Sequence, residues 1–310
     1  MSLGRHHWLG LYLRGIAMGA ADLVPGVSGG TIALITGIYD RFITAIASVG
    51  IDPLRMVLAG RVKDAWAHID GNFLVAVGAG ILSSVVALAS LLNWLLLNYP
   101  LPLWALFCGL ILASAIHLFY TSRIDWTGRE YALWLTGLGV ATVIGLMQAT
   151  QLPVGPISVF FAGAVAISAM LLPGISGSFL LLIMGMYQPV ISALVNVDLA
   201  TVGLFALGCL CGLLVFSRLL KALLARAQKA TMAVLYGFLL GSVIMLWPWQ
   251  QPISSVIDRH GESRVVQSVP VLPQTYEGLV GEPMLWQCLL AFSLGAGLVS
   301  LLLSVGSVEH

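Results

Sequence analysis

Two short segments of this sequence combine residue types that can hold a negative charge inside an apolar environment. The first is Pro25-Gly-Val-Ser-Gly-Gly-Thr31, and the second is Pro173-Gly-Ile-Ser-Gly-Ser178. Proline removes a backbone donor and glycine allows otherwise strained angles, so each segment predicts a break between two helices. A helix that restarts after such a break presents free N–H groups and a partial positive charge, which favour anions such as phosphate.

The candidate phosphate ligands are the residues that begin each restarted helix. Ser28 and Ser176 are predicted N-caps. The predicted backbone donors are Gly29, Gly30 and Thr31 after the first break, and Gly177 and Ser178 after the second. The hairpin turns themselves are Pro25 with Gly26 and Pro173 with Gly174. Small residues of this kind also mediate tight helix packing, but two copies at matching positions favour a binding site.

Two charged residues precede the first turn. Arg14 and Asp22 lie about two helical turns apart, so both side chains can face one cavity. Arg14 is a candidate for bidentate phosphate binding, and Asp22 for orienting Arg14 or taking a proton. The alternatives are that Arg14 extends to the headgroups and that Asp22 caps the turn. Tyr39 and Tyr187 end the restarted segments, as interfacial anchors or as cavity-lining residues.

The composition places these motifs in a membrane. The chain has 310 residues, of which 59% are hydrophobic and only 9% are charged, and its mean hydropathy is +0.99. Soluble domains carry about a quarter charged residues. Apolar runs of about 18 residues or more recur, and each is long enough to cross the hydrocarbon core as a helix. The net charge of +1 gives no basic field for nucleic acid.

The chain repeats itself, which predicts an all-α polytopic membrane protein built from two inverted repeats. Gly80 and Gly109 match Gly208 and Gly237 at one constant offset, and Leu138-Gly139 matches Leu294-Gly295 more weakly. Each repeat is predicted to hold a helical hairpin, expected to be re-entrant, and three transmembrane helices. The first repeat (1–153) has its hairpin at 8–48 and helices at 72–97, 101–120 and 131–150. The second (154–310) has its hairpin at 156–195, helices at 199–220, 230–248 and 284–305, and an external loop at 250–282. Three crossings per repeat make the halves antiparallel, whether the hairpins are re-entrant or spanning.

Lysine and arginine positions predict the orientation, because these residues accumulate on the cytoplasmic side. With a cytoplasmic N-terminus, only Arg259 and Arg264 fall outside. The chain is therefore expected to be a multi-pass protein of the bacterial inner membrane. Arg218 and Lys221 are interpreted as topology determinants that can also meet an anionic headgroup. The expected partners are membrane lipids, with the oligomeric state open, and no cofactor or metal is expected.

The two motif-bearing stretches, Ala21-Asp-Leu-Val-Pro-Gly-Val-Ser-Gly-Gly-Thr31 with its continuation to Tyr39 and Leu171-Leu-Pro-Gly-Ile-Ser-Gly-Ser178 with its continuation to Tyr187, resemble the DUF368 membrane family. The similarity extends over essentially the whole chain. The resemblance implies a polyprenyl-phosphate transporter. Its implied substrate is undecaprenyl phosphate, returned from the outer to the cytoplasmic leaflet for reuse in peptidoglycan and other envelope polymers.

The leading hypothesis is therefore a non-enzymatic flippase for this carrier lipid. One alternative is an intramembrane lipid phosphatase, because undecaprenyl-pyrophosphate phosphatases are similar in having inverted repeats and a P-G-x-S-R-S-G turn. This chain has Gly29 where that pattern has arginine, which leaves a departing phosphate poorly stabilised. A second alternative is a channel or carrier for small anions, since serine and glycine at helix ends suit any small anion.

Overall fold

The computed structural model describes residues 5–23, 27–122, 124–147, 152–257 and 263–306. The fold is mostly helical, and each predicted hairpin contains three helices. The first hairpin consists of α1 (Arg5–Asp22), α2 (Gly29–Ile35) and α3 (Tyr39–Ala47). The second consists of α9 (Pro156–Leu171), α10 (Gly177–Ile183) and α11 (Tyr187–Val195). Gly37 and Gly185 have positive φ, 73° and 68°, at the bends before α3 and α11. Glycine adopts this conformation without the strain that other residues incur.

Long apolar helices lie in the ranges where spans are predicted, and their crossing of a membrane stays a prediction. They are α6 (Gly71–Asn98), α7 (Pro100–Thr121), α8 (Gly128–Leu146), α12 (Leu199–Gly241) and α14 (Leu285–Gly306). The two spans predicted at 199–220 and 230–248 are joined in α12, which is interrupted by non-helical dihedrals at Ala227 and continues into the 3-10 helix η1 (Ser242–Leu246). By length and composition, three helices of the described chain can cross a membrane: α6, α7 and the run from Leu199 to Leu246. The bent pair α10 and α11 would add a fourth.

Glycines set how closely the long helices pack. A Cβ atom on Gly80 of α6 would collide with the carbonyl oxygen of Tyr12 in α1. A Cβ atom on Gly208 of α12 would meet the carbonyl oxygen of Phe160 in α9 in the same way. The helix pairs α7 with α14 and α8 with α12 make comparable contacts. Small residues let helix backbones approach closely, which favours association inside lipid.

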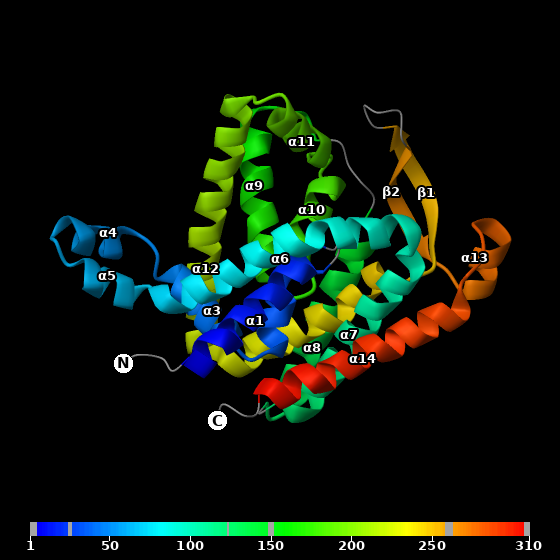
Figure 1. The fold of residues 1–310 in the computed structure, drawn as a ribbon, viewed down its shortest axis with the longest axis horizontal. Coiled ribbons are helices and arrows are strands. Elements are labelled where there is room, and N and C mark those ends of the chain that lie inside the picture. The colour runs from blue at the N-terminus through cyan, green and yellow to red at the C-terminus, as the bar shows by residue number, and fades with distance from the viewer. Residues whose placement is uncertain (1–4, 24–26, 123, 148–151, 258–262, 307–310) are drawn as a thin grey trace.

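The crossed helices separate two structures at opposite ends of the molecule (Figure 1). One end carries α4 (Ile51–Leu58) and α5 (Val62–His68), and the other carries an antiparallel ribbon and α13 (Pro273–Leu279). The ribbon pairs β1 (Gln250–Ile257) with β2 (Ser263–Pro270). The all-α prediction is therefore wrong for Gln250–Ile257 and Ser263–Pro270, which lie in the predicted external loop. In this polar excursion the β-branched residues of β2 favour an extended strand over a helix.

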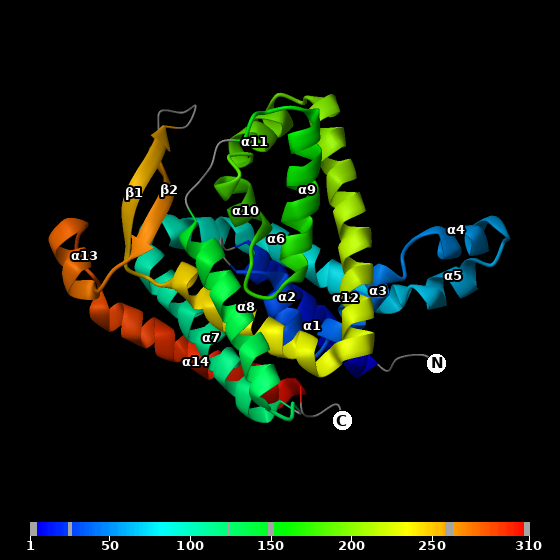
Figure 2. The same ribbon diagram turned by 180° about the vertical axis from the view of Figure 1, so that it is seen from behind.

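The second hairpin and the first part of α12 project from the remaining helices, as both ribbon views show (Figures 1 and 2). The largest hydrophobic cluster instead surrounds the first hairpin, with Leu11, Ile43, Phe73 and Ile111 fully or almost fully buried. All seven residues of α2 are buried. The first hairpin thus lies in the protein core, while the second lies at the edge of it.

Candidate functional site

The two broken segments meet in the interior of the protein. The Ser28 hydroxyl donates a hydrogen bond of 2.8 Å to the carbonyl oxygen of Met170. The amide of Gly174 donates to the Thr31 hydroxyl at 2.8 Å. The Tyr39 hydroxyl donates to the carbonyl oxygen of Leu171 at 2.8 Å. Three side chains of the first hairpin therefore satisfy backbone groups of the second turn, which a buried broken helix requires.

The amides at the start of α2 are engaged by groups of the same hairpin. Gly29 donates its N–H to the Asp22 carboxylate at 2.6 Å. Gly30 donates to the Ser28 hydroxyl at 3.1 Å, so Ser28 is the N-cap that the sequence predicted. The Asp22 carboxylate thus occupies the position at the helix end where an external anion would bind. This supports the alternative that the sequence offered for Asp22, in which it caps the turn.

The second turn has a different arrangement. Ser176 begins α10 without a side-chain cap bond, because its hydroxyl pairs with that of Ser178 at 2.8 Å. Gly174 has φ +85°, and a Cβ atom there would lie 2.7 Å from the Ser242 hydroxyl. Gly177 packs against the backbone of α9 at Ala166. Two hydroxyls beside α10 are therefore held together and away from the amides that follow them.

The remaining predicted site residues have separate surroundings. Pro25 and Gly26 lie outside the described residues. Arg14 is partly buried on α1, and its part in anion binding stays a prediction. Tyr39 is 2% exposed, so it is a core residue that joins the hairpins. Tyr187 packs at the start of α11 against a small cluster that includes Met186. Cavity lining by either tyrosine stays a prediction.

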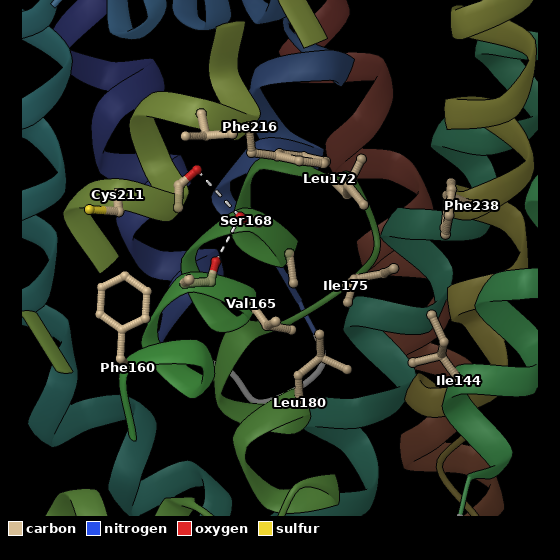
Figure 3. Close-up of a pocket in the computed structure, with 14 residues that line it drawn as sticks. Ile144, Phe160, Val165, Ser168, Leu172, Ile175, Leu180, Cys211, Phe216 and Phe238 are labelled. Atoms are coloured by element: carbon tan, nitrogen blue, oxygen red, sulfur yellow. Dashed lines mark hydrogen bonds between the residues drawn. The ribbon is translucent and has the colours of Figure 1, made fainter. Parts of the chain in front are cut away.

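An apolar cavity of about 470 Å³ opens beside the second turn. Figure 3 shows Phe160, Val165 and Cys211 on one side and Ile144 and Phe238 on the other. The turn contributes Leu172 and Ile175, and α10 contributes Leu180. The one hydroxyl among the labelled residues belongs to Ser168, which donates to the carbonyl oxygen of Ala164 at 2.7 Å. This donor is satisfied within α9, so the cavity offers an apolar surface to a ligand.

A second cavity, of about 420 Å³, lies on the other side of α10 beneath the ribbon. It is lined by Phe179 and Leu182 of α10 and by polar side chains of the 250–282 region that include Gln250, Ser268 and Tyr276. Burial raises the pKa of the Tyr276 phenol above its ordinary value, so the group is a neutral hydroxyl at physiological pH. The short helix α10 therefore separates an apolar cavity from a more polar one.

Comparison with known proteins gives the family. Residues 18–264 match the model of the VCA0040-like family, described as undecaprenyl phosphate translocase-like. The chain belongs to this family. A polyprenyl-phosphate transporter of Vibrio cholerae serotype O1 is 40% identical over 291 residues, which cover 94% of each protein. A polyprenyl-phosphate transporter of Staphylococcus aureus is 35% identical over 258 residues, covering 78% of this chain and 86% of the relative.

Membership in the translocase-like family confirms the resemblance drawn from the two turn motifs. No solved structure matches this chain. The family relatives are named as transporters, which is consistent with a chain that is not an enzyme. Together with the long apolar helices, they indicate a multi-pass membrane protein.

Proposed function

We propose that this protein moves undecaprenyl phosphate from the outer to the cytoplasmic leaflet, so that the carrier lipid is reused in peptidoglycan and other envelope synthesis. The names of both relatives support the substrate class. The observation that carries the proposal is the meeting of two broken hairpins beside an apolar cavity. A phosphate stripped of water faces a cost of many kcal/mol in hydrocarbon, which polar groups at such a meeting point would offset.

We propose that the halves are inverted repeats, as the antiparallel scheme predicted. The glycine contacts support this, because the contacts between the two halves form equivalent pairs. Gly109 on α7 packs on Phe292 of α14, and its equivalent Gly237 on α12 packs on Trp134 of α8. In the same way Gly295 packs on Leu106, and Gly137 packs on Val234. These contacts favour Gly137, two residues before the matched Gly139, as the equivalent of Gly295.

Repeats of this kind give a transporter two related states around one site. In the proposed cycle the phosphate displaces the Asp22 carboxylate from the Gly29 amide, since the two anions compete for one helix end. Arg14 and the hydroxyls of Ser176 and Ser178 supply further donors. The isoprenoid tail rests in the apolar cavity beside Leu172, Ile175 and Leu180. Asp22 then expels the phosphate when it returns to Gly29.

The proposed orientation has the N-terminus, α4 and α5 in the cytoplasm and the β-ribbon outside. Basic residues support it, because α4 and α5 carry Arg55, Arg61 and Lys63. In this orientation the more polar cavity beneath β1 and β2 faces the outer leaflet. It offers a route along α10 from the outside to the meeting point of the hairpins.

The direct test is lipid translocation by the purified full-length protein in vesicles. Polyprenyl phosphate is placed in both leaflets, and a phosphatase added outside hydrolyses only the exposed pool. With active protein the inner pool becomes accessible, so hydrolysis goes to completion instead of stopping near one half. Arg14→Gln should slow this second phase at least about tenfold, because it removes a charge-assisted phosphate contact. Arg61→Gln, an exposed cation on α5 paired with Asp64, is the matched control and should leave it unchanged.

Three outcomes would contradict the proposal. Hydrolysis that stops at one half with active, monodisperse protein would exclude lipid translocation under these conditions. Equally fast uptake of radiolabelled inorganic phosphate into protein-containing vesicles that lack polyprenyl phosphate would favour the small-anion carrier. Release of phosphate from the lipid by the protein alone, before phosphatase is added, would favour the intramembrane phosphatase.

A further inference from the structure

A polar cavity of about 480 Å³ lies far from the hairpin turns, at the end of the molecule that carries α4 and α5. It is formed where α3 ends, α4 begins, α5 ends and the first part of α12 passes. Four basic side chains line it: Arg55, His68, Arg218 and Lys221. Asp52 is the one acid among the described residues of its wall. The cavity therefore carries an excess of positive charge.

Two of the cations are held in place by the end of α3. Arg218 donates to the carbonyl oxygen of Val49 at 3.0 Å, and Lys221 donates to the Ser48 hydroxyl at 3.4 Å. Both lie on one face of α12, because residues three apart are neighbours on a helix. A Cβ atom on Gly50 would collide with the Arg218 guanidinium, so the loop leaves room for this side chain. The two charges are thus positioned before any ligand arrives.

The other two basic side chains that line the cavity are Arg55 and His68. Arg55 approaches Asp52 only to 4.0 Å, with both side chains about three-quarters exposed, at 76% and 75%. Such a pair contributes little to stability, so Arg55 is available to an anionic ligand. His68 closes the cavity from the last turn of α5. Arg55 therefore provides charge with little structural role, and it can be mutated together with His68.

The helices beside the cavity carry apolar side chains that are largely exposed in the described structure. Leu54, Leu58 and Val62 are 57%, 79% and 58% exposed, and α4 has no buried residue. Trp66 of α5 is 44% exposed, and tryptophan is enriched at membrane interfaces. Short helices with exposed apolar residues and neighbouring cations lie in the headgroup region of a bilayer. The basic cavity is then at the depth of lipid phosphates.

We propose that this cavity binds the phosphate of an anionic lipid in the leaflet on which α4 and α5 lie. It is a second phosphate site, separate from the hairpin turns, and it does not depend on translocation. The ligand class is a lipid phosphomonoester or phosphodiester, whose oxygens accept charge-assisted hydrogen bonds from the guanidinium and ammonium groups. The tail of the bound lipid lies beside the apolar residues of α4.

The test uses the full-length protein in phosphatidylcholine nanodiscs with a small fraction of fluorescent phosphatidic acid as the probe. Salt of about 0.3 M screens long-range attraction to exposed charges. Arg218→Gln with Lys221→Gln, and separately Arg55→Gln with His68→Gln, should each weaken probe binding about tenfold or more. The matched control is Arg61→Gln with Lys63→Gln, which removes two charges from α5 outside the cavity and should change binding less than about threefold.

Three results would overturn the proposal. If diffuse surface charge attracted the lipid, the control double variant would weaken binding as much as the two cavity double variants. Millimolar inorganic phosphate would displace the probe if the cavity were built for the free ion. Finally, Gly50→Ala keeps every charge but displaces the Arg218 guanidinium, and unchanged binding in this variant would exclude a positioned cation. If the loss of Arg218 unfolds the loop, the double variant Arg55→Gln with His68→Gln still tests binding in the cavity.

Discussion

The two hairpins share a backbone plan but differ in charge and in burial. Both have a serine N-cap position and a positive-φ glycine before the last helix. The first hairpin carries Arg14 and Asp22, whereas the residues at the matching positions of the second are Ala162 and Met170. The first is enclosed by the core, and the second borders two cavities. A common backbone plan is therefore compatible with one charged, enclosed hairpin and one neutral hairpin beside cavities.

The hydrogen bonds between the hairpins are also unequal. Side chains of the first hairpin bind the backbone of the second, through Ser28, Thr31 and Tyr39. The position that matches Thr31 is Phe179, which has no hydroxyl and lines the more polar cavity. If the two hairpins exchanged roles, side chains of the second hairpin could not form all the equivalent bonds to the backbone of the first. In the proposed cycle this difference in side chains favours one of the two states, which mutations can test.

The largest expected effect comes from what the halves share, the close helix contacts. Gly80→Val and Gly208→Val should each destabilise the protein by about 3 kcal/mol or more, because the new side chain forces two helix backbones apart. Gly78→Val and Gly203→Val are the controls, since a Cβ atom at either position meets nothing within 4 Å. The readout is thermal unfolding in detergent. Similar losses at all four glycines would contradict the backbone contacts.

The next effect tests the unequal bonds. Tyr39→Phe removes the donor to the carbonyl oxygen of Leu171 and leaves this buried group unsatisfied, which costs about 2 kcal/mol. Tyr187→Phe at the matching position should cost less than about 0.5 kcal/mol, because this tyrosine is only partly buried. Thermal unfolding under identical conditions measures both. Equal losses would show that the hairpins depend on their tyrosines alike.

The charge difference predicts a change in ligand affinity. Asp22→Asn keeps an oxygen to accept the Gly29 amide but removes the charge that competes with phosphate. We expect polyprenyl phosphate to bind about tenfold more tightly, about 1.4 kcal/mol, and to be released more slowly. Met170→Leu, at the matching position of the second hairpin, should leave the affinity unchanged. Weaker binding in Asp22→Asn would indicate that Asp22 helps to hold the ligand.

The helices and the turns could be predicted from the sequence because their signals are local. Apolar length marks α6 and α7 within one or two residues, and the Pro-Gly pairs mark both breaks. The spacing of the first motif also predicted that Ser28 and Thr31 lie at the start of the helix after the break, as they do in α2. The partner of each group depends on how distant segments pack, so the bond from Ser28 to Met170 has no local signal.

One feature escaped prediction and another was left open between two uses, for different reasons. The ribbon contains Pro252 and Pro270, which suggested a loop. Pro270 ends β2, and Pro252 lies beside a register shift in the pairing of β1 with β2, where a proline is tolerated. The sequence leaves two uses open for Asp22, because a charge before a turn can serve a ligand or cap the helix end. The structure has Asp22 accept the Gly29 amide. Geometry alone decides between these two uses.

The smallest expected effect tests the shared bends before α3 and α11. Gly37→Ala and Gly185→Ala place a side chain at φ 73° and 68°, which costs about 1 kcal/mol at each position. Gly139→Ala in α8, where a Cβ atom meets nothing within 4 Å, should instead be neutral or slightly stabilising. Thermal unfolding gives all three values. If the strain at Gly185 is absorbed and that at Gly37 is not, the hairpin that borders the cavities is the more adaptable one. Such a result would favour the second hairpin as the part that moves in the proposed cycle. A Cβ atom on Gly37 meets nothing within 4 Å, so the difference would reflect how readily the backbone adapts and not a lack of space.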